Sequence, residues 1–229
     1  MSRNGRIAML GGTFDPPHVG HLVVAQDVLE RLSLDRLIVV PAGDPPHRGA
    51  TLPARDRLEL VRLAFGGDDR IEVSDVEVGR SGPSYTVDTL EWLRQRFEPA
   101  ALYLVIGADQ LRTFGTWHRP GRILELATLA VMTRPGEEDV LERADVPFER
   151  VQVTRVDLSS TRVRARLGEG QSIRYLVPER IREMVEAAWG RSGDLHTAPN
   201  VESAEEPDRG RREPQSPVSA GRGETEREC

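Results

Sequence analysis

The chain contains no lysine and only one cysteine among its 229 residues, and these two shortages exclude several kinds of chemistry. All 31 basic residues are arginine. A phosphate-binding loop that ends in Gly-Lys-Ser/Thr is therefore absent, and Schiff-base catalysis through a lysine is excluded. Because Cys229 is the only cysteine, disulfides within the chain are excluded, and neither Cys-ligated zinc nor a buried catalytic thiol is expected.

Long apolar runs and an excess of positive charge are also missing. No uninterrupted apolar stretch approaches the ~18 residues that a membrane-spanning helix needs. The first residues do not lead into an apolar signal segment before the Gly11–Pro17 turn interrupts them, so we expect a cytoplasmic protein with no membrane partner. The net charge is −6 and no basic block occurs, so nucleic acid is not an expected partner either.

The composition changes sharply near Gly190. From Leu195 to Cys229 there is no aromatic residue, and Pro, Glu, Arg, Ser and Gly dominate. Such a segment cannot bury enough apolar surface to offset the entropy lost on ordering. The sequence therefore predicts one folded domain over residues 1–190 and a disordered tail over residues 191–229.

Within the first 190 residues, short apolar runs alternate with amphipathic stretches. Four runs have the form of strands buried on both faces: Arg6–Leu10, Arg36–Val40, Ala101–Ile106 and Leu126–Met132. Three stretches carry apolar residues at helical spacing: Gly20–Leu32, Thr86–Phe97 and Pro178–Trp189. This alternation predicts an α/β fold, a doubly wound, Rossmann-like and mostly parallel sheet with helices on both faces.

A glycine- and histidine-containing string follows the first predicted strand, where open α/β sheets bind ligands. It reads GGTFDPPHVGHL over Gly11–Leu22. Glycines allow a tight turn and a close approach to a ligand, and the helix that follows presents free amides. His18 and His21 are three residues apart, so their side chains point the same way. Two imidazoles in this position suit a bound triphosphate and charge that develops on a transferring phosphorus.

This string also has three other interpretations. The histidines could simply be satisfied side chains of a Gly/Pro turn. They could also bind a metal, although only Asp15 offers a further ligand nearby; we expect no metal site made by the protein. The spacing does not match Gly-x-Gly-x-x-Gly, which argues against a dinucleotide-dependent oxidoreductase.

A second string, DLSSTRVR over Asp157–Arg164, combines hydroxyl groups with arginine. Hydroxyl residues at the start of a helix cap free amides, so an ordinary N-cap with a basic surface is one interpretation. The other is a second anion site, in which Ser160, Thr161 and Arg164 hold the outer phosphates of a nucleotide.

Together the two strings resemble the paired motifs of the nucleotidyltransferase superfamily, Gly-Thr-Phe-Asp-Pro-x-His-x-Gly-His and Ser-Ser-Thr-x-x-Arg. Within it the sequence is similar to the bacterial nicotinate-nucleotide adenylyltransferases from Ile7 to about Trp189. Further strings support that branch: Pro45–Arg48, Pro83–Leu90, Ile106–Asp109, Trp117–Arg119 and Thr133–Gly136.

The resemblance implies transfer of AMP from ATP to nicotinate mononucleotide, with Mg²⁺ carried by the ATP phosphates. It implies three catalytic residues: His18, His21 and Arg164. The residues implied to bind ATP are Gly11, Gly12, Thr13, Phe14, Gly107, Asp109, Ser160 and Thr161. Those implied to bind the acceptor are His47, Arg48, Tyr85, Thr86, Trp117 and Arg134.

Several of these residues have a physical rationale of their own. Amides at Tyr85–Thr86 start a helix and suit a small carboxylate, although an ordinary N-cap has the same sequence. Trp117 could stack on a pyridine ring or belong to the core. His118 is assigned no role.

Two alternative functions stay open at this point. One is an adenylyl- or cytidylyltransferase for another acceptor, such as phosphopantetheine. The other is a nucleotide-binding regulator without activity.

Overall fold

The computed structural model describes residues 5–45, 49–133 and 145–190, and the account below concerns this part of the chain. The expected tail, residues 191–229, lies outside it, so the predicted domain end at residue 190 stays a prediction. Among the described residues, no helix combines the length and the apolar character needed to cross a bilayer.

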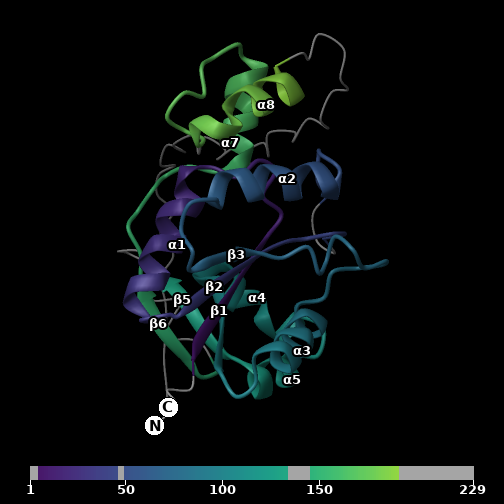
Figure 1. Cartoon of the computed structure of the whole chain (residues 1–229), viewed down its shortest axis with the longest axis vertical. Coiled ribbons are helices and arrows are strands. Elements are labelled where there is room, and N and C mark those ends of the chain that lie inside the picture. Colours follow the sequence, from purple (N-terminus) through teal and green to yellow (C-terminus); the bar gives the residue numbers. More distant parts are fainter. Residues whose placement is uncertain (1–4, 46–48, 134–144, 191–229) are drawn as a thin grey trace, which may run out of the picture. The chain divides into compact units, whose positions relative to one another are not determined.

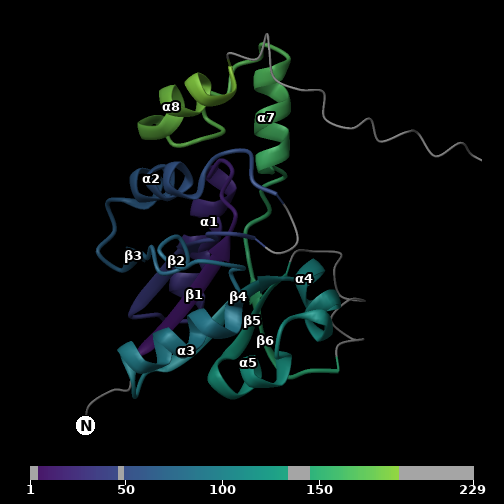
Figure 2. The same ribbon diagram turned by 90° about the vertical axis from the view of Figure 1, so that its right-hand side faces the viewer.

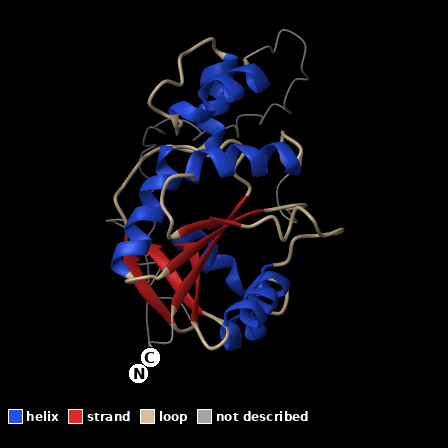
Figure 3. Ribbon diagram, viewed as in Figure 1, coloured by secondary structure: helices blue, strands red, loops and turns tan. Residues whose placement is uncertain are grey.

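The centre of the fold is one sheet (Figure 3). Its six strands are all parallel and have the order β3-β2-β1-β4-β5-β6. The strands are β1 (Arg6–Gly12), β2 (Arg36–Pro41), β3 (Ile71–Val73), β4 (Ala101–Gly107), β5 (Thr128–Thr133) and β6 (Phe148–Gln152). The chain first builds outward from β1 to β3 and then returns to β4 on the other side of β1. The switch point of this order lies between β1 and β4, where doubly wound sheets bind their ligands.

The helices are α1 (Val19–Arg31), α2 (Ala54–Phe65), α3 (Thr86–Phe97), α4 (Ala108–Thr113), α5 (Pro120–Leu126), α7 (Ser160–Gly168) and α8 (Glu179–Trp189), with a 3₁₀ turn at Phe114–Thr116. Prolines mark three of the starts. Pro53 and Pro178 are the N-caps of α2 and α8, and Pro120 is the first residue of α5. Proline suits these positions because its missing N–H would have had no partner within the helix.

Helices cover both faces of the sheet (Figures 1 and 2). An apolar layer forms on each face. In β1, Ala8 and Leu10 pack with residues of α1, α2 and α8. The intervening residues, Ile7 and Met9, pack with residues of α3, α4 and α5. Because successive side chains enter different layers, each central strand is an unbroken apolar run in the sequence.

The predicted α/β doubly wound sheet is confirmed, and the four predicted strands are β1, β2, β4 and β5. The predicted start of the fourth strand at Leu126 is wrong. Leu126 ends α5, and the Ala127 amide donates to the Ile123 carbonyl at 3.0 Å. The apolar side chain of Leu126 belongs to α5 and packs in the layer that α3, α4 and α5 form with the sheet. The edge strands β3 and β6 were not predicted, since β3 has three residues and β6 has only one buried residue, Val151.

Candidate active site

His18 and His21 stand together at the start of α1, just beyond the carboxyl end of β1. His18 is the N-cap of the helix, with extended backbone (φ −143°, ψ 169°). Its amide donates to Nδ1 of His21 at 3.1 Å, and the two rings stack with their centroids 3.8 Å apart. The prediction that both side chains point the same way is confirmed.

Burial keeps both imidazoles neutral at neutral pH. It lowers the pKa of His18 to about 4. It also lowers the pKa of His21, which the adjacent His18 lowers further, to about 3. Because Nδ1 of His21 accepts a hydrogen bond, neutral His21 carries its proton on Nε2 and can donate from there. Nδ1 of His18 is buried and has no hydrogen-bond partner within the described chain.

Close packing fixes the histidines against the turn that precedes them. A Cβ at Gly20 would lie 3.0 Å from the His18 ring, so a larger residue would push that ring aside. On the other side, the Phe14 ring meets the His21 ring edge-on, with centroids 4.9 Å apart. Phe14 itself is buried and has φ of +51°. The turn is therefore a rigid support for the two imidazoles.

The start of α7 docks directly on this turn. Ser159 caps the helix by accepting from the Arg162 amide at 3.2 Å. The Ser160 hydroxyl then donates to the carbonyl of Pro16 at 2.8 Å, although the two residues are 144 positions apart. The Arg164 guanidinium donates to the carbonyl of Asp15. These bonds join the two motifs that the sequence placed at opposite ends of the domain.

The joined motifs enclose one cavity of about 380 Å³. Nine of the predicted site residues line it: Gly11, Gly12, Thr13, Phe14, His18, His21, Ser160, Thr161 and Arg164. The N-termini of α1 and α7 both reach this cavity. The amides of His18, Val19 and His21 already donate within the protein, to Nδ1 of His21 and to the carbonyls of Leu176 and His18. The first amides of α7 are therefore the main addition to the hydroxyl and guanidinium donors. A volume of this size is within the range of roughly 300–1,000 Å³ typical of small-molecule sites.

Sequence reasoning missed several lining residues, among them Gln110, Met132 and Thr154. Met132 lies near the carboxyl end of β5 and Thr154 follows β6. Met132 is the last residue of the predicted strand Leu126–Met132, so a search that included the final residue of each predicted strand would have found it. Thr154 had no such signal, because β6 was not predicted.

Gly107 and Asp109 do not line this cavity. Gly107 is the N-cap of α4, and its amide donates to the side-chain oxygen of Gln110 at 2.9 Å. Asp109, in the first turn of α4, is exposed. Through Gln110, which does line the cavity, this segment borders the site.

Tyr85, Thr86 and Trp117 also lie outside the cavity lining. Tyr85 is the N-cap of α3 and Thr86 is its first residue, as predicted. The prediction of a free Tyr85 amide is wrong, because that amide donates to the carbonyl of Pro83 at 3.1 Å. Trp117 is half-buried beside Phe114. The next residue, His118, stacks on Tyr85 with ring centroids 4.3 Å apart, a contact that the sequence did not suggest.

Three predicted acceptor residues lie outside the described part of the chain: His47, Arg48 and Arg134.

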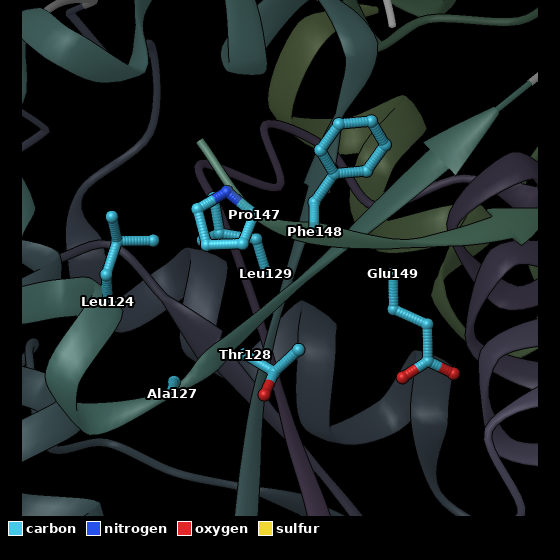
Figure 4. A pocket seen from close by; sticks show the side chains of 7 residues that line it. All are labelled: Leu124, Ala127, Thr128, Leu129, Pro147, Phe148 and Glu149. Carbon is cyan, nitrogen blue, oxygen red and sulfur yellow. The ribbon is translucent and has the colours of Figure 1, made fainter. Parts of the chain in front are cut away.

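A second pocket, of about 320 Å³, lies at the amino ends of two strands, opposite to the strand ends that border the first cavity (Figure 4). It is formed where β5 and β6 begin, by Leu124, Ala127, Thr128, Leu129, Pro147, Phe148 and Glu149. Its only charged group is a carboxylate, so it does not suit an anionic ligand.

The cavity offers little to hold a metal ion by protein groups alone. The buried carboxylate of Asp15 accepts from the amides of Thr51 at 2.6 Å and Leu52 at 3.1 Å. Arg164 also lies 3.8 Å from this carboxylate. Over the described residues, no group of three or more His, Cys, Asp or Glu side chains is arranged to bind a cation.

Comparisons with known proteins agree with this arrangement. Residues 9–166 match the cytidylyltransferase-like family. A nicotinate-nucleotide adenylyltransferase of Gemmatimonas aurantiaca is 44% identical over 184 residues, which are 77% of this chain and 87% of that protein. One of Thermus thermophilus is 44% identical over 181 residues, 79% of this chain and 96% of the other.

A solved structure shares the fold at much lower identity. Nicotinic acid mononucleotide adenylyltransferase of Plasmodium falciparum, complexed with NaAD, has a TM-score of 0.67 and 17% identity, covering 80% of this chain and 96% of that one. The family match over residues 9–166 covers both motifs and the cavity between them. The chain therefore belongs to the nicotinate-nucleotide adenylyltransferase family of cytidylyltransferase-like enzymes.

Proposed function

We propose that this enzyme transfers the AMP group of ATP to nicotinate mononucleotide, releasing pyrophosphate and nicotinate adenine dinucleotide. The observation that carries the proposal is the docking of α7 on the glycine turn, which puts the histidine pair and Arg164 in one cavity. The names of the 44% identical relatives support this choice of substrates. The reaction needs neither a nucleic acid nor a membrane.

The reaction forms one bond and breaks one at the α-phosphorus of ATP. A phosphate oxygen of the acceptor attacks, and pyrophosphate leaves with its electron pair, so no covalent enzyme intermediate is required. Catalysis is then positioning together with stabilisation of charge on the phosphate oxygens. We assign His18 to the α-phosphate. We assign the β- and γ-phosphates to His21 and to Ser160, Thr161 and Arg164.

The state of the imidazoles supports these roles. Both are neutral at neutral pH, and His21 can donate from Nε2. A neutral donor that is already oriented stabilises an oxyanion without a reorganisation step. The main chain of the glycine turn, Gly11–Phe14, would lie along the nucleotide, with Gly107 and Asp109 near the ribose hydroxyls.

We refer to this group, the glycine turn, the histidine pair and the start of α7, as the donor side. The acceptor side is the start of α3 with Trp117. There we assign the Thr86 amide to the carboxylate of nicotinate and Trp117 to stacking on its ring. We also assign Tyr85 to this side. His47, Arg48 and Arg134 are assigned to acceptor binding on the family resemblance alone.

We propose Mg²⁺ as the cation that accompanies ATP. Because both oxygens of the Asp15 carboxylate already accept amide hydrogen bonds, the phosphate oxygens of ATP would supply most of the ligands. The ion would neutralise part of the negative charge of the ATP phosphates, together with Arg164 and the helix N-termini.

The direct test is pyrophosphate release from Mg-ATP with each candidate acceptor. Nicotinate mononucleotide, nicotinamide mononucleotide and phosphopantetheine are supplied in turn, and CTP replaces ATP in a parallel series. We expect release with ATP and nicotinate mononucleotide, and none in the absence of an acceptor. A His18→Ala chain purified in the same way controls for contaminating activity. Release with phosphopantetheine alone, or with no acceptor at all, would contradict the proposal.

A further inference from the structure

Arg57 is a buried charged residue in the first turns of α2. Only 1% of its surface is exposed, which makes it one of the largest fully buried side chains of the described chain. A guanidinium is expensive to bury unless each of its donors has a partner. Its partners therefore indicate what the charge is needed for.

Arg57 donates to three main-chain carbonyls in two loops. Nη1 donates to Thr13 at 2.7 Å. Nη2 donates to Gly43 at 3.1 Å and Nε to Leu52 at 3.1 Å. Thr13 lies in the loop that follows β1. Gly43 and Leu52 lie near the beginning and the end of the loop that joins β2 to α2. One rigid fork thus fixes the relative positions of three chain segments.

Two of these contacts lead to the donor side. Thr13 belongs to the glycine turn and lines the cavity. The amide of Leu52 donates to the carboxylate of Asp15 at 3.1 Å. Asp15 also receives the Arg164 guanidinium on its main-chain carbonyl. Arg57 and α7 therefore both fix the glycine turn. Arg57 does so through the carbonyl of Thr13, and α7 does so through the carbonyls of Pro16 and Asp15.

The third contact leads to the acceptor side. The amides of Gly43 and Asp44 both donate to the Ser84 hydroxyl, at 3.0 and 3.1 Å. Ser84 directly precedes Tyr85, the N-cap of α3. The packing at Gly43 is tight, because a Cβ there would lie 2.2 Å from the carbonyl oxygen of Glu77. The series of contacts that leads from Arg57 to the start of α3 thus has little freedom to shift.

We propose that Arg57 is a positioning residue that, through Thr13 on one side and Gly43 and Ser84 on the other, sets the separation of the donor and acceptor sides. The inference rests on the proposed function. In-line transfer requires the attacking oxygen and the α-phosphorus to meet at a fixed distance, and a displacement of about 1 Å can cost about 100-fold in rate. An apolar residue could fill the same volume, but it would leave three half-buried carbonyls without the donors that Arg57 supplies.

The test compares Arg57→Lys with a matched control, Arg94→Lys. A lysine can reach one carbonyl but cannot bridge three. Arg94 likewise donates to two main-chain carbonyls, those of Ala100 and Leu126, which lie before β4 and β5 and away from both sides of the site. Each chain is assayed at a temperature where circular dichroism shows it to be folded. Dissociation constants of ATP and of nicotinate mononucleotide are measured separately.

We expect Arg57→Lys to lower kcat by at least ~10-fold while each dissociation constant changes by less than about threefold. Arg94→Lys should lose stability without losing kcat. Equal kcat for Arg57→Lys and Arg94→Lys, or an Arg57→Lys defect confined to binding of one substrate, would overturn the proposal.

A second variant keeps the proposal testable where Arg57→Lys does not fold. Ser84→Ala removes the acceptor of two loop amides, so it should lower kcat in the same direction, by about 5-fold. The double variant should be no worse than Arg57→Lys alone, because the two residues act through one link. If the losses of kcat in the two single variants added in the double variant, the two residues would act independently, and the proposed link would be contradicted. If the wild-type enzyme shows no turnover, the proposed function fails and the inference with it. Normal wild-type turnover with unchanged kcat in Ser84→Ala and Arg57→Lys overturns the inference alone.

Discussion

The donor side and the acceptor side of this enzyme are built in different ways. On the donor side, His18 is buried and hydrogen bonds join residues that are 144 and 149 positions apart. On the acceptor side, the aromatic groups are half-buried or exposed, and Tyr85 stacks on His118 from a neighbouring loop. The donor side is thus assembled before any ligand binds, while the acceptor side offers a more open surface.

This difference agrees with the chemistry proposed for each side. Groups that stabilise a transition state must be oriented in advance, because reorganisation during the reaction would cancel their benefit. Groups that select an acceptor need only to distinguish bound molecules, and a few contacts on loops can do this. Variants on the donor side should therefore affect kcat, whereas those on the acceptor side should affect binding and specificity.

The largest effect is expected from His18→Ala. Removing one oriented donor at the α-phosphate should lower kcat by at least ~100-fold, with a much smaller change in ATP affinity. Steady-state pyrophosphate release and a separate ATP-binding measurement check this. A nearly normal kcat in the variant would contradict the role proposed for His18 at the α-phosphate.

The choice of acceptor should give the next largest effect. If the Thr86 amide meets the ring substituent, a carboxylate accepts its hydrogen bond and gains from the positive end of α3. An amide substituent gains less, so nicotinate mononucleotide should exceed nicotinamide mononucleotide in kcat/KM by about 10- to 100-fold. Trp117→Ala is the control, since stacking does not distinguish the two rings and both acceptors should weaken equally. Equal kcat/KM for both mononucleotides in the wild-type enzyme would contradict this assignment.

A smaller effect is expected on stability at acid pH. The pKa values of His18 and His21 are about 4 and 3 in the folded enzyme, below the ordinary value of 6.5. The unfolded chain therefore takes up protons first as the pH falls below about 6.5. Above that pH the two histidines do not make stability depend on pH. Below it, their protonation lowers the free energy of unfolding, down to about pH 4 for His18 and about pH 3 for His21. The free energy of unfolding, measured with urea across this range, should depend less on pH for His21→Gln than for the wild-type enzyme. The difference between the two proteins at pH 8 measures any loss of packing caused by the substitution.

The smallest effect is expected from removing residues 195–229. We propose that the enzyme's activity resides in residues 1–190, because the composition beyond Leu195 does not favour a packed core. Truncation should leave the melting temperature and kcat nearly unchanged. A loss of several degrees would show that the removed residues stabilise the domain.

Strong local signals in the sequence were sufficient for the central strands and for both motifs. The runs at β1, β2 and β4 were recognisable because their residues are buried on both faces. The spacing of His18 and His21 was sufficient to predict that they share a face, because that geometry depends only on the local backbone.

Contacts between distant segments were decided by the tertiary structure alone. The edge strand β6 carries one buried residue, so nothing in its own sequence distinguished it from a loop. Nothing in the sequence distinguished Arg57 from the other arginines, yet it is buried because two loops bring three carbonyls to it. The sequence alone determined which residues favour strand, turn or helix, since those preferences act over a few neighbours. Which polar groups meet was decided only by folding, because it depends on how distant loops come together at the edge of the sheet.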